Sequence, residues 1–228
     1  MSAMRALGDE LWYLRGPDFA LPGGARMPLG CTVARLPDRT LLIYAPIGFD
    51  ADAAAAIDAL GRVAHLVAPN LFHHLYLTDA LGRWPQAVLH APAGLAAKRP
   101  DLPPARRLGA PDPAWGGALD LIRTDGAPRL DEHVLLHHPS GTLLCADLCF
   151  HIGRPVNLAS RLVFGLMGVG GERLAQSRAW RLLARDRAAA RVAVERVLAW
   201  PIRQIAPCHG EPVAVTAGEL RLVLNRIG

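Results

Sequence analysis

Runs of residues typical of strands and of helices alternate through the first half of the chain. A strand-like hairpin over residues 30–46 is followed by an alanine-rich helical pattern over 50–60 and by an apolar run of strand length at 63–69. A second helical pattern at 73–81 and a short apolar run at 87–92 continue the series. Helices that connect strands in this way cover the faces of a sheet. The alternation therefore predicts a layered α/β fold.

The second half of the chain returns to strands and then ends in helices. Residues 119–126 and 131–148 are strand-like, and the second segment contains a Pro-Ser-Gly turn that would fold it into a hairpin. Apolar residues recur at helical spacing over 172–200, the segment 202–210 is typical of a last strand, and 218–227 is typical of a final helix. These patterns extend the α/β prediction along the whole chain.

Length and composition fit one domain. With 228 residues, of which 51% are hydrophobic and 20% charged, the chain can bury a large core. The proline-rich segment 98–117 is typical of irregular connecting chain, and no internal repeat or polar linker divides the sequence. We therefore expect a single domain over residues 1–228.

Charge and apolar patterning limit the partners. The net charge is +5, but the arginines are scattered along helical segments, as on a solvated helix face, so we expect no nucleic-acid partner. No apolar stretch approaches the ~18 residues of a membrane span, and the first residues do not resemble a signal peptide. The cysteines form no CxxC pair and are expected to be small buried residues: Cys31, Cys145, Cys149 and Cys208. We expect a cytoplasmic protein with no membrane partner.

Polar residues that can bind metal follow three of the expected strands. Residues 70–74 (NLFHH) follow the run at 63–69, Asp147 follows the hairpin's second strand, and His209 follows the last strand. Loops at strand ends collect function in layered α/β folds because the sheet holds them rigid. Singly, each residue could be a turn, a helix cap or a packed side chain. Together, imidazole and carboxylate groups are the ligands that suit Zn²⁺, Fe or Mn.

The order and setting of these residues resemble the metallo-β-lactamase superfamily. In that family one strand leads into H-x-H-x-D-H, a later hairpin strand ends in Asp (commonly L-F-T-G-D), and a late strand ends in G-H-G. The counterparts here are PNLFHHL, TLLCADLCF and APCHG. The segments VAPNLFHH, PAGLAAKRPDL, HPSGTLL and ADLCFHI are also similar to an uncharacterised bacterial branch of the superfamily, a domain of unknown function. The resemblance covers most of the chain and implies a four-layer αββα sandwich.

The resemblance assigns metal ligands residue by residue. His73 and His74 fall at the Asp-His end of the first motif, which makes His74 the expected ligand, while His73 joins it or orients a neighbour. Asp147 matches the metal-binding Asp of the family, and His209 matches the late histidine of its second metal site. The resemblance thus implies His73, His74, Asp147 and His209 as metal ligands, with Asp147 and His74 as the catalytic residues.

The motif is degenerate at other family positions. The two earlier histidines fall on Pro69 and Leu71, and Ala127 stands where the family has the histidine of T-P-G-H. Two ions could then be held only with recruits, of which His151 and Glu132 are the first candidates. Further candidates lie in the same segments: His133, His137, His138 and Cys208. We therefore expect one divalent metal, with zinc preferred and iron or manganese as alternatives.

The expected activity is hydrolysis of a small-molecule substrate at a mononuclear site. A divalent ion lowers the pKa of water toward ~7 and so supplies a nucleophile for an ester, thioester, lactone or phosphoester. One alternative is a non-catalytic binding or structural member of the fold that has lost its metal. Another is redox chemistry on iron, because this fold also hosts di-iron centres. The segments 98–117 and 152–171 could overhang the pocket, and the apolar part of the second could cover a hydrophobic substrate or form a homodimer contact.

Overall fold

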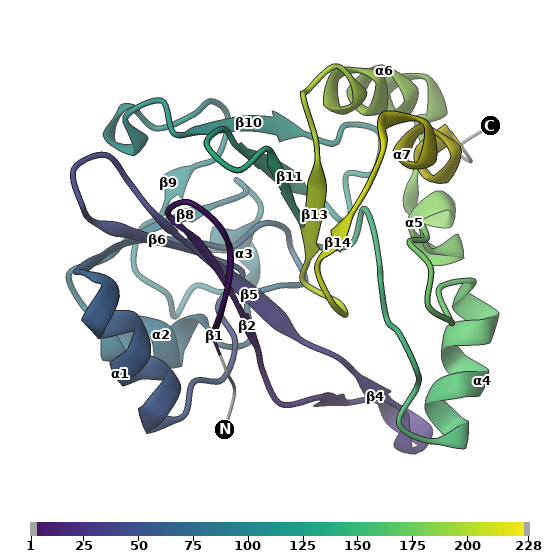
Figure 1. Ribbon diagram of the computed structural model, residues 1–228, viewed down its shortest axis with the longest axis horizontal. Coiled ribbons are helices and arrows are strands. Elements are labelled where there is room, and N and C mark those ends of the chain that lie inside the picture. The colour runs from purple at the N-terminus through teal and green to yellow at the C-terminus, as the bar shows by residue number, and fades with distance from the viewer. Residues whose placement is uncertain (1–3, 226–228) are drawn as a thin grey trace.

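Two β-sheets with helices outside them make up the computed structural model, which describes residues 4–225 (Figure 1). The larger sheet has seven strands in the order β1-β2-β5-β6-β7-β8-β9. Their bounds are β1 (Met4–Gly8), β2 (Leu11–Arg15), β5 (Gly30–Arg35), β6 (Leu41–Tyr44), β7 (Val63–Val67), β8 (Val88–Ala91) and β9 (Arg106–Arg107). A separate hairpin consists of β3 (Phe19–Ala20), the 3₁₀ turn η1 (Pro22–Gly24) and β4 (Arg26–Met27).

The smaller sheet has five strands in the order β10-β11-β12-β13-β14. Their bounds are β10 (Leu119–Arg123), β11 (His133–His137), β12 (Thr142–Cys145), β13 (Gln204–Pro207) and β14 (Val213–Ala214). The helices are α1 (Ala51–Leu60), α2 (Leu77–Arg83), α3 (Leu95–Lys98), α4 (Leu158–Met167), α5 (Arg178–Leu183), α6 (Arg187–Leu198) and α7 (Ala217–Leu224), with a 3₁₀ turn η2 (Pro113–Trp115).

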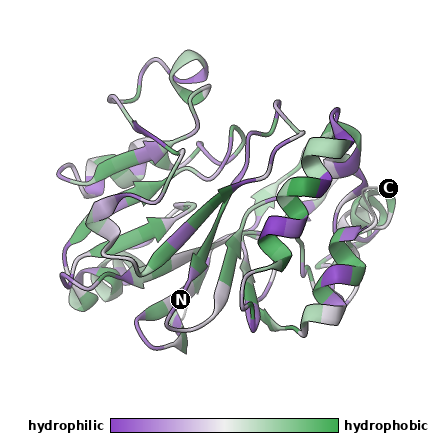
Figure 2. Cartoon of the chain, turned by 90° about the horizontal axis from the view of Figure 1, so that it is seen from above, coloured by the Kyte–Doolittle hydropathy of each residue, from purple (hydrophilic) through white to green (hydrophobic). Residues whose placement is uncertain are grey.

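Three clusters of buried side chains hold four layers together. Apolar residues of α1, α2 and α3 pack with one face of the larger sheet, and those of α5, α6 and α7 pack with one face of the smaller sheet. The opposite faces of the two sheets share the third cluster, which includes Tyr44, Trp115 and Leu135. Figure 2 shows hydrophobic runs along the strands and mixed polarity on the helices, as expected when only one side of a helix is buried. This arrangement confirms the predicted αββα sandwich.

Local signals determine where several helices begin and end. Asp50 caps α1, because its side chain accepts a hydrogen bond from the backbone N–H of Ala53 at 2.7 Å. Gly61 ends α1 where a Cβ would lie only 2.8 Å from a backbone oxygen. Thr216 and Glu219 form a reciprocal capping box at the start of α7. The predicted final helix is thus observed as α7, while residues 226 and 227 of that prediction lie outside the described residues.

Helix α2 starts later than the sequence pattern indicated. The prediction placed helix over 73–81, whereas α2 begins at Leu77. The preceding residues form turns, because the side chain of Asn70 accepts hydrogen bonds from the backbone N–H groups of Phe72 and His73. A side chain that binds these N–H groups competes with helix formation.

Helix α4 was not predicted from the glycine-rich segment 152–171. Asn157 caps its start by accepting a hydrogen bond from the N–H of Ser160 at 2.8 Å. Gly168 ends it in the left-handed conformation, with a φ of 76°. The cap residue and the terminal glycine are both visible in the sequence, but the glycines between and beyond them concealed the pattern.

Backbone hydrogen bonds join the two sheets at the edge where β7 and β13 end. The N–H of Gly30 donates to the carbonyl oxygen of Cys208 at 2.9 Å, and the N–H of His133 donates to that of Pro69 at 2.8 Å. Since β12 and β13 are parallel neighbours, their carboxyl ends lie at this same edge. The loops that follow β7, β12 and β13 are therefore brought together.

Two further expectations concern the cysteines and the membrane. All four cysteines are buried and free, as predicted. Within residues 4–225, no helix combines the length and the apolar character that crossing a bilayer requires.

Candidate metal centre

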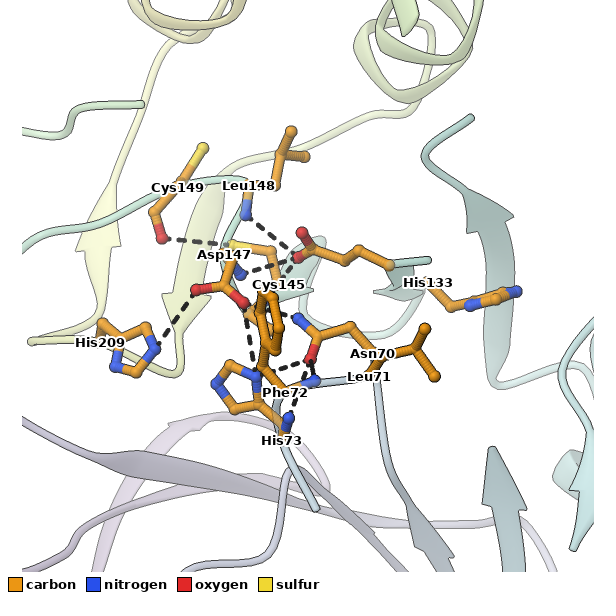
Figure 3. Close-up of polar contacts among 12 residues, drawn as sticks. Asn70, Leu71, Phe72, His73, His133, Cys145, Asp147, Leu148, Cys149 and His209 are labelled. Atoms are coloured by element: carbon orange, nitrogen blue, oxygen red, sulfur yellow. Dashed lines mark hydrogen bonds and ion pairs between the residues drawn. The ribbon is translucent and has the colours of Figure 1, made fainter. Parts of the chain in front are cut away.

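Three side chains from three loops meet at one point. His73 lies in the turn after β7, Asp147 lies two residues beyond β12, and His209 lies two residues beyond β13. One possible ligand atom from each residue lies within 4.8 Å of the other two. Figure 3 shows the three side chains pointing toward one another. They are only 14%, 19% and 10% exposed, respectively, so protein surrounds most of the group.

Asn70 fixes two of the three residues at once. Its Oδ1 accepts hydrogen bonds from the backbone N–H groups of Phe72 and His73 and from Nδ1 of His73, each at 2.9 Å. Its Nδ2 donates to Oδ2 of Asp147 at 2.7 Å (Figure 3). The sequence pattern marks Asn70 only as the start of the segment that contains His73 and His74. Its signal is an Asn directly after the apolar run at 63–69, because Asn commonly forms such a side-chain turn.

The ring of His209 has one nitrogen engaged by the backbone. Its Nδ1 lies 3.1 Å from the carbonyl oxygen of Pro28, which places the ring hydrogen on Nδ1. Its Nε2 lies 3.6 Å from Oδ1 of Asp147. Phe150 stacks on the ring, with a centroid separation of 5.1 Å and an interplanar angle of 11°. A carbonyl that holds Nδ1–H in this way leaves Nε2 free to bind a metal ion.

The ring of His73 shows the same division between its nitrogens. With Nδ1 bonded to Asn70, Nε2 is buried and has no hydrogen-bond partner among residues 4–225. Its ring centroid lies 5.1 Å from that of His209. A buried polar atom without a partner is costly, and a metal ion at this point would remove the cost.

Burial and neighbouring charge set the protonation states. Burial lowers the pKa of His73 to about 4, although the negative charge of Asp147 opposes the shift. Burial alone would raise the pKa of Asp147, but His73, His209 and Asn70 hold it well below its usual range. At neutral pH the imidazole of His73 is therefore neutral and the carboxylate is ionised, which are the forms that bind metal.

Glu132 supports the loop that carries Asp147. Its Oε1 accepts hydrogen bonds from the N–H groups of Ala146, Asp147 and Leu148 at 2.8, 3.0 and 3.1 Å. Burial and then the charge of Asp147 raise the pKa of Glu132. The sequence names Glu132 as a possible additional ligand, but it does not belong to the group of three. Its hydrogen bonds instead hold the backbone of the loop that carries Asp147.

His74 points elsewhere, which corrects the choice made between the two adjacent histidines. Its Nδ1 lies 3.2 Å from Nη1 of Arg99, and the same Nη1 donates to the carbonyl oxygen of His74 at 2.8 Å. His73 and not His74 meets Asp147 and His209, because the turn around Asn70 directs position 73 inward. His74 was also expected to be catalytic, and the structure does not bring it to the group.

The other candidate recruits make contacts of their own. Nδ1 of His151 lies 2.8 Å from the carbonyl oxygen of Glu211. A Cβ on Gly210 would lie 1.8 Å from the carbonyl oxygen of His151, so the glycine after His209 permits this close approach. Three histidines have partners in the smaller sheet or its loops: His133 with Asp131, His137 with Ser140 and His138 with Asp120.

The degenerate motif positions are occupied by structural contacts. Ala127 is buried in the cluster beneath α6. The carbonyl oxygen of Pro69 accepts the bond from His133, and the N–H of Leu71 donates to Leu130 at 2.9 Å. These positions supply no side-chain donor to the group.

The donor set fits one divalent ion. Two imidazole nitrogens and one carboxylate oxygen form a three-ligand set of the kind that leaves a coordination position open at catalytic zinc sites. The unpartnered Nε2 of His73 and the depressed pKa of Asp147 agree with this use. Within residues 4–225, no other set of three or more His, Cys, Asp or Glu side chains is as closely grouped.

A cavity of about 210 Å³ adjoins the three side chains. Beyond His73, Asp147 and His209, its walls come from the β3–β4 hairpin, the segment after β6 and the turn after β7, and they are mainly apolar. Cys208, one of the candidate additional ligands, also lines this cavity.

The fold is shared with several solved structures. A metallo-β-lactamase from Pontibacter korlensis matches with a TM-score of 0.66 and 13% identity, over 100% of this chain and 99% of that one. A metallo-β-lactamase from Hirschia baltica matches with a TM-score of 0.63 and 14% identity, over 99% and 95%. A flavodiiron core from Synechocystis matches with a TM-score of 0.68 and 14% identity over 99% of this chain, which spans 60% of that longer chain. No protein-family model matches the sequence, and no curated protein matches it significantly. The chain therefore has the metallo-β-lactamase fold.

Proposed function

We propose that this protein is a mononuclear metal-dependent hydrolase of a small-molecule substrate. His73, Asp147 and His209 would hold one divalent ion, with zinc preferred. The observation that carries the proposal is that one possible ligand atom from each of the three residues lies within 4.8 Å of the other two. In addition, Nε2 of His73 is buried and has no hydrogen-bond partner among residues 4–225. A bound divalent ion supplies a Lewis acid and lowers the pKa of water toward neutrality.

The chain's own residues orient and shield this site. Asn70 and the carbonyl oxygen of Pro28 each hold the Nδ1 atom of one histidine, so both Nε2 atoms remain unprotonated and ready to bind. Asp147 supplies the negative charge that retains a dication, and Asn70 fixes one of its oxygens. The mainly apolar walls of the cavity would let a bound substrate displace water from this side of the site.

The test begins with untagged protein purified without chelator. Elemental analysis should find about one zinc, iron or manganese ion per chain, and a chelator should lower the melting temperature. Turnover of small esters, thioesters and lactones should appear with metal and vanish in Asp147→Asn and His209→Ala. The control is His138→Ala, because His138 is exposed and lies in the β11–β12 hairpin. Metal-dependent melting without any turnover would favour the non-catalytic alternative. If the protein shows neither metal-dependent melting nor turnover, the proposal is wrong.

We also propose a cytoplasmic location, which the four free, buried cysteines support. The single domain over residues 1–228, the lack of a nucleic-acid partner and the homodimer stay predictions.

A further inference from the structure

We propose that the centre acts on neutral substrates whose apolar group, of about eight non-hydrogen atoms, lies in the cavity beside His73, Asp147 and His209. The reaction rests on the proposed function. The preference of the cavity for a neutral apolar group rests on its size, walls and charge, and can be measured without turnover.

The volume of the cavity sets the size of the group. An engineered protein cavity of ~150 Å³ with aliphatic and aromatic walls holds one benzene molecule, or roughly 25 Å³ for each non-hydrogen atom. The cavity here measures about 210 Å³. On the same scale it holds about eight non-hydrogen atoms, which corresponds to a medium-length acyl chain or a phenylethyl group.

The walls favour hydrocarbon. Outside the group of three, the lining side chains are mainly aliphatic, aromatic or thioether, including Phe19, Leu21, Met27, Leu29 and Ile47. Moving one methylene from water into such surroundings strengthens binding roughly fourfold. Affinity should therefore rise with chain length until the cavity is full.

Among residues 4–225, no Lys or Arg side chain lines the cavity, although the full sequence has 25 of them. Two cations, Lys98 and Arg99, contact the turn after β7, but neither lines the cavity. Nζ of Lys98 donates to the carbonyl oxygen of Leu71 at 2.6 Å and lies 5.0 Å from the ring centroid of Phe72 at the rim, and Arg99 pairs with Asp101 at 2.6 Å. A carboxylate or phosphate in the apolar part would be buried without a cation, which is strongly unfavourable. The cavity therefore selects against an anionic tail.

The rim of the cavity exposes apolar surface that a ligand would cover. Phe72 and Leu75 line the cavity, yet they are 47% and 53% exposed. Both belong to the turn that carries His73, and Figure 3 shows Phe72 next to that histidine. An apolar group seated here would cover part of this surface while its polar end approaches the three side chains.

The part of the cavity wall formed by the β3–β4 hairpin is held in place by α4, so affinity should stop rising abruptly once the ligand chain fills the cavity. The β3–β4 hairpin supplies Phe19, Leu21 and Met27 to the wall. Oγ of the buried Ser160 on α4 accepts a hydrogen bond from the N–H of Arg26 at 2.8 Å. Figure 1 shows β4 and α4 together at one end of the molecule. A wall tied to a helix cannot easily retreat for a longer chain.

The binding experiment uses chelator-treated protein and calorimetric titration with 1-butanol, 1-hexanol, 1-octanol, 1-decanol and octanoate. We expect affinity to rise roughly fourfold per methylene up to 1-octanol and then to level off. Octanoate should bind at least tenfold more weakly than 1-octanol, because its carboxylate would lie beside that of Asp147 with no Lys or Arg in the lining to offset the repulsion. Equal affinity for octanoate and 1-octanol, or no dependence on chain length, would overturn the proposal.

Two variants place the binding in the cavity. Leu21→Trp narrows it and should weaken 1-octanol at least tenfold while changing 1-butanol less than twofold. Leu21→Ala enlarges it and should shift the preference to 1-decanol. The matched control is Leu222→Trp on α7, where the leucine is 73% exposed and does not line the cavity. An equal effect of Leu21→Trp and Leu222→Trp would show that binding occurs elsewhere.

Ester hydrolysis measurements distinguish the preference of the cavity for an apolar group from the proposed hydrolase function. With zinc-loaded protein, kcat/KM for 4-nitrophenyl esters should rise from acetate to octanoate and fall for palmitate. If 1-octanol binds as expected and no ester, thioester or lactone is hydrolysed, the hydrolase assignment fails while the cavity's preference stands. If esters are hydrolysed without any dependence on chain length, the hydrolase assignment stands and the preference fails.

Discussion

Asn70 and Asp147 are joined by a hydrogen bond of 2.7 Å across 77 residues of sequence, and this bond connects the turn after β7 to the loop after β12. Oδ1 of the same amide accepts a hydrogen bond from Nδ1 of His73 at 2.9 Å. One buried side chain thereby positions a histidine that follows a strand of the larger sheet and a carboxylate that follows a strand of the smaller sheet.

Asn70→Ala should lower zinc affinity about 10- to 100-fold, because His73 loses the acceptor that fixes its ring and Asp147 loses a donor. Competition with a chromophoric chelator measures this. Asn157→Ala is the matched control, since Asn157 also accepts a backbone N–H but does so at the start of α4. It should cost about 1 kcal/mol of stability and leave zinc affinity unchanged. Equal loss of affinity in both variants would contradict the role assigned to Asn70.

The adjacent histidines should behave differently on substitution. His73→Ala should abolish stoichiometric zinc binding, because it removes one of only three ligands. His74→Ala should leave zinc affinity within about threefold, because the ring of His74 contacts Arg99 instead. Equilibrium dialysis of the two variants side by side measures both. If only His74→Ala lost zinc, His74 and not His73 would be the metal ligand, as the sequence resemblance implies.

Glu132 should stabilise the fold through the oxygen that accepts three backbone hydrogen bonds. Glu132→Gln keeps an oxygen that can accept the three N–H groups, whereas Glu132→Ala leaves them buried without an acceptor. We expect Glu132→Ala to reduce the free energy of unfolding by about 3 kcal/mol or more and Glu132→Gln to reduce it by much less. Urea unfolding measures the difference. Glu172→Ala serves as an exposed control and should leave the midpoint unchanged. Similar losses in Glu132→Gln and Glu132→Ala would contradict this role of the acceptor oxygen.

The buried pair of His65 and His90 should make the fold sensitive to acid. Nδ1 of His65 lies 2.9 Å from Nε2 of His90. Burial, followed by the neighbouring His65, lowers the pKa of His90 from 6.5 to about 4. The unfolded chain then binds a proton at higher pH than the folded chain. The free energy of unfolding should therefore fall as the pH decreases from about 6.5 toward about 4.

The contribution of His90 can be isolated by substitution. A shift of this size corresponds to about 3 kcal/mol over that pH range. His90→Gln should be less stable than the parent chain at pH 7 but should lose less on acidification, as measured by urea unfolding at pH 7 and pH 5. His138→Gln, at an exposed position, should retain the full pH dependence. An unchanged pH dependence in His90→Gln would exclude His90 as a cause.

The sequence by itself determined the elements whose signals are local. The apolar period located β5, β7, β12 and β13, and turn residues located both hairpins, because these preferences act between residues a few positions apart. It also indicated which strand ends carry metal-binding side chains, since Asp147 and His209 follow recognisable strands. Where local signals conflicted they misled: glycines concealed α4, and helical spacing extended α2 across the turn around Asn70.

Only the tertiary structure decided which of these side chains act together. The choice of His73 over His74 depends on Asn70 and Asp147, and the orientation of His209 depends on Pro28, 181 residues away in sequence. Glu132 looked like a ligand by type, yet three N–H groups from another strand end make it a support. The cavity likewise combines the β3–β4 hairpin with loops from both sheets. Such contacts depend on how the sheets pack, and no local period in the sequence records that.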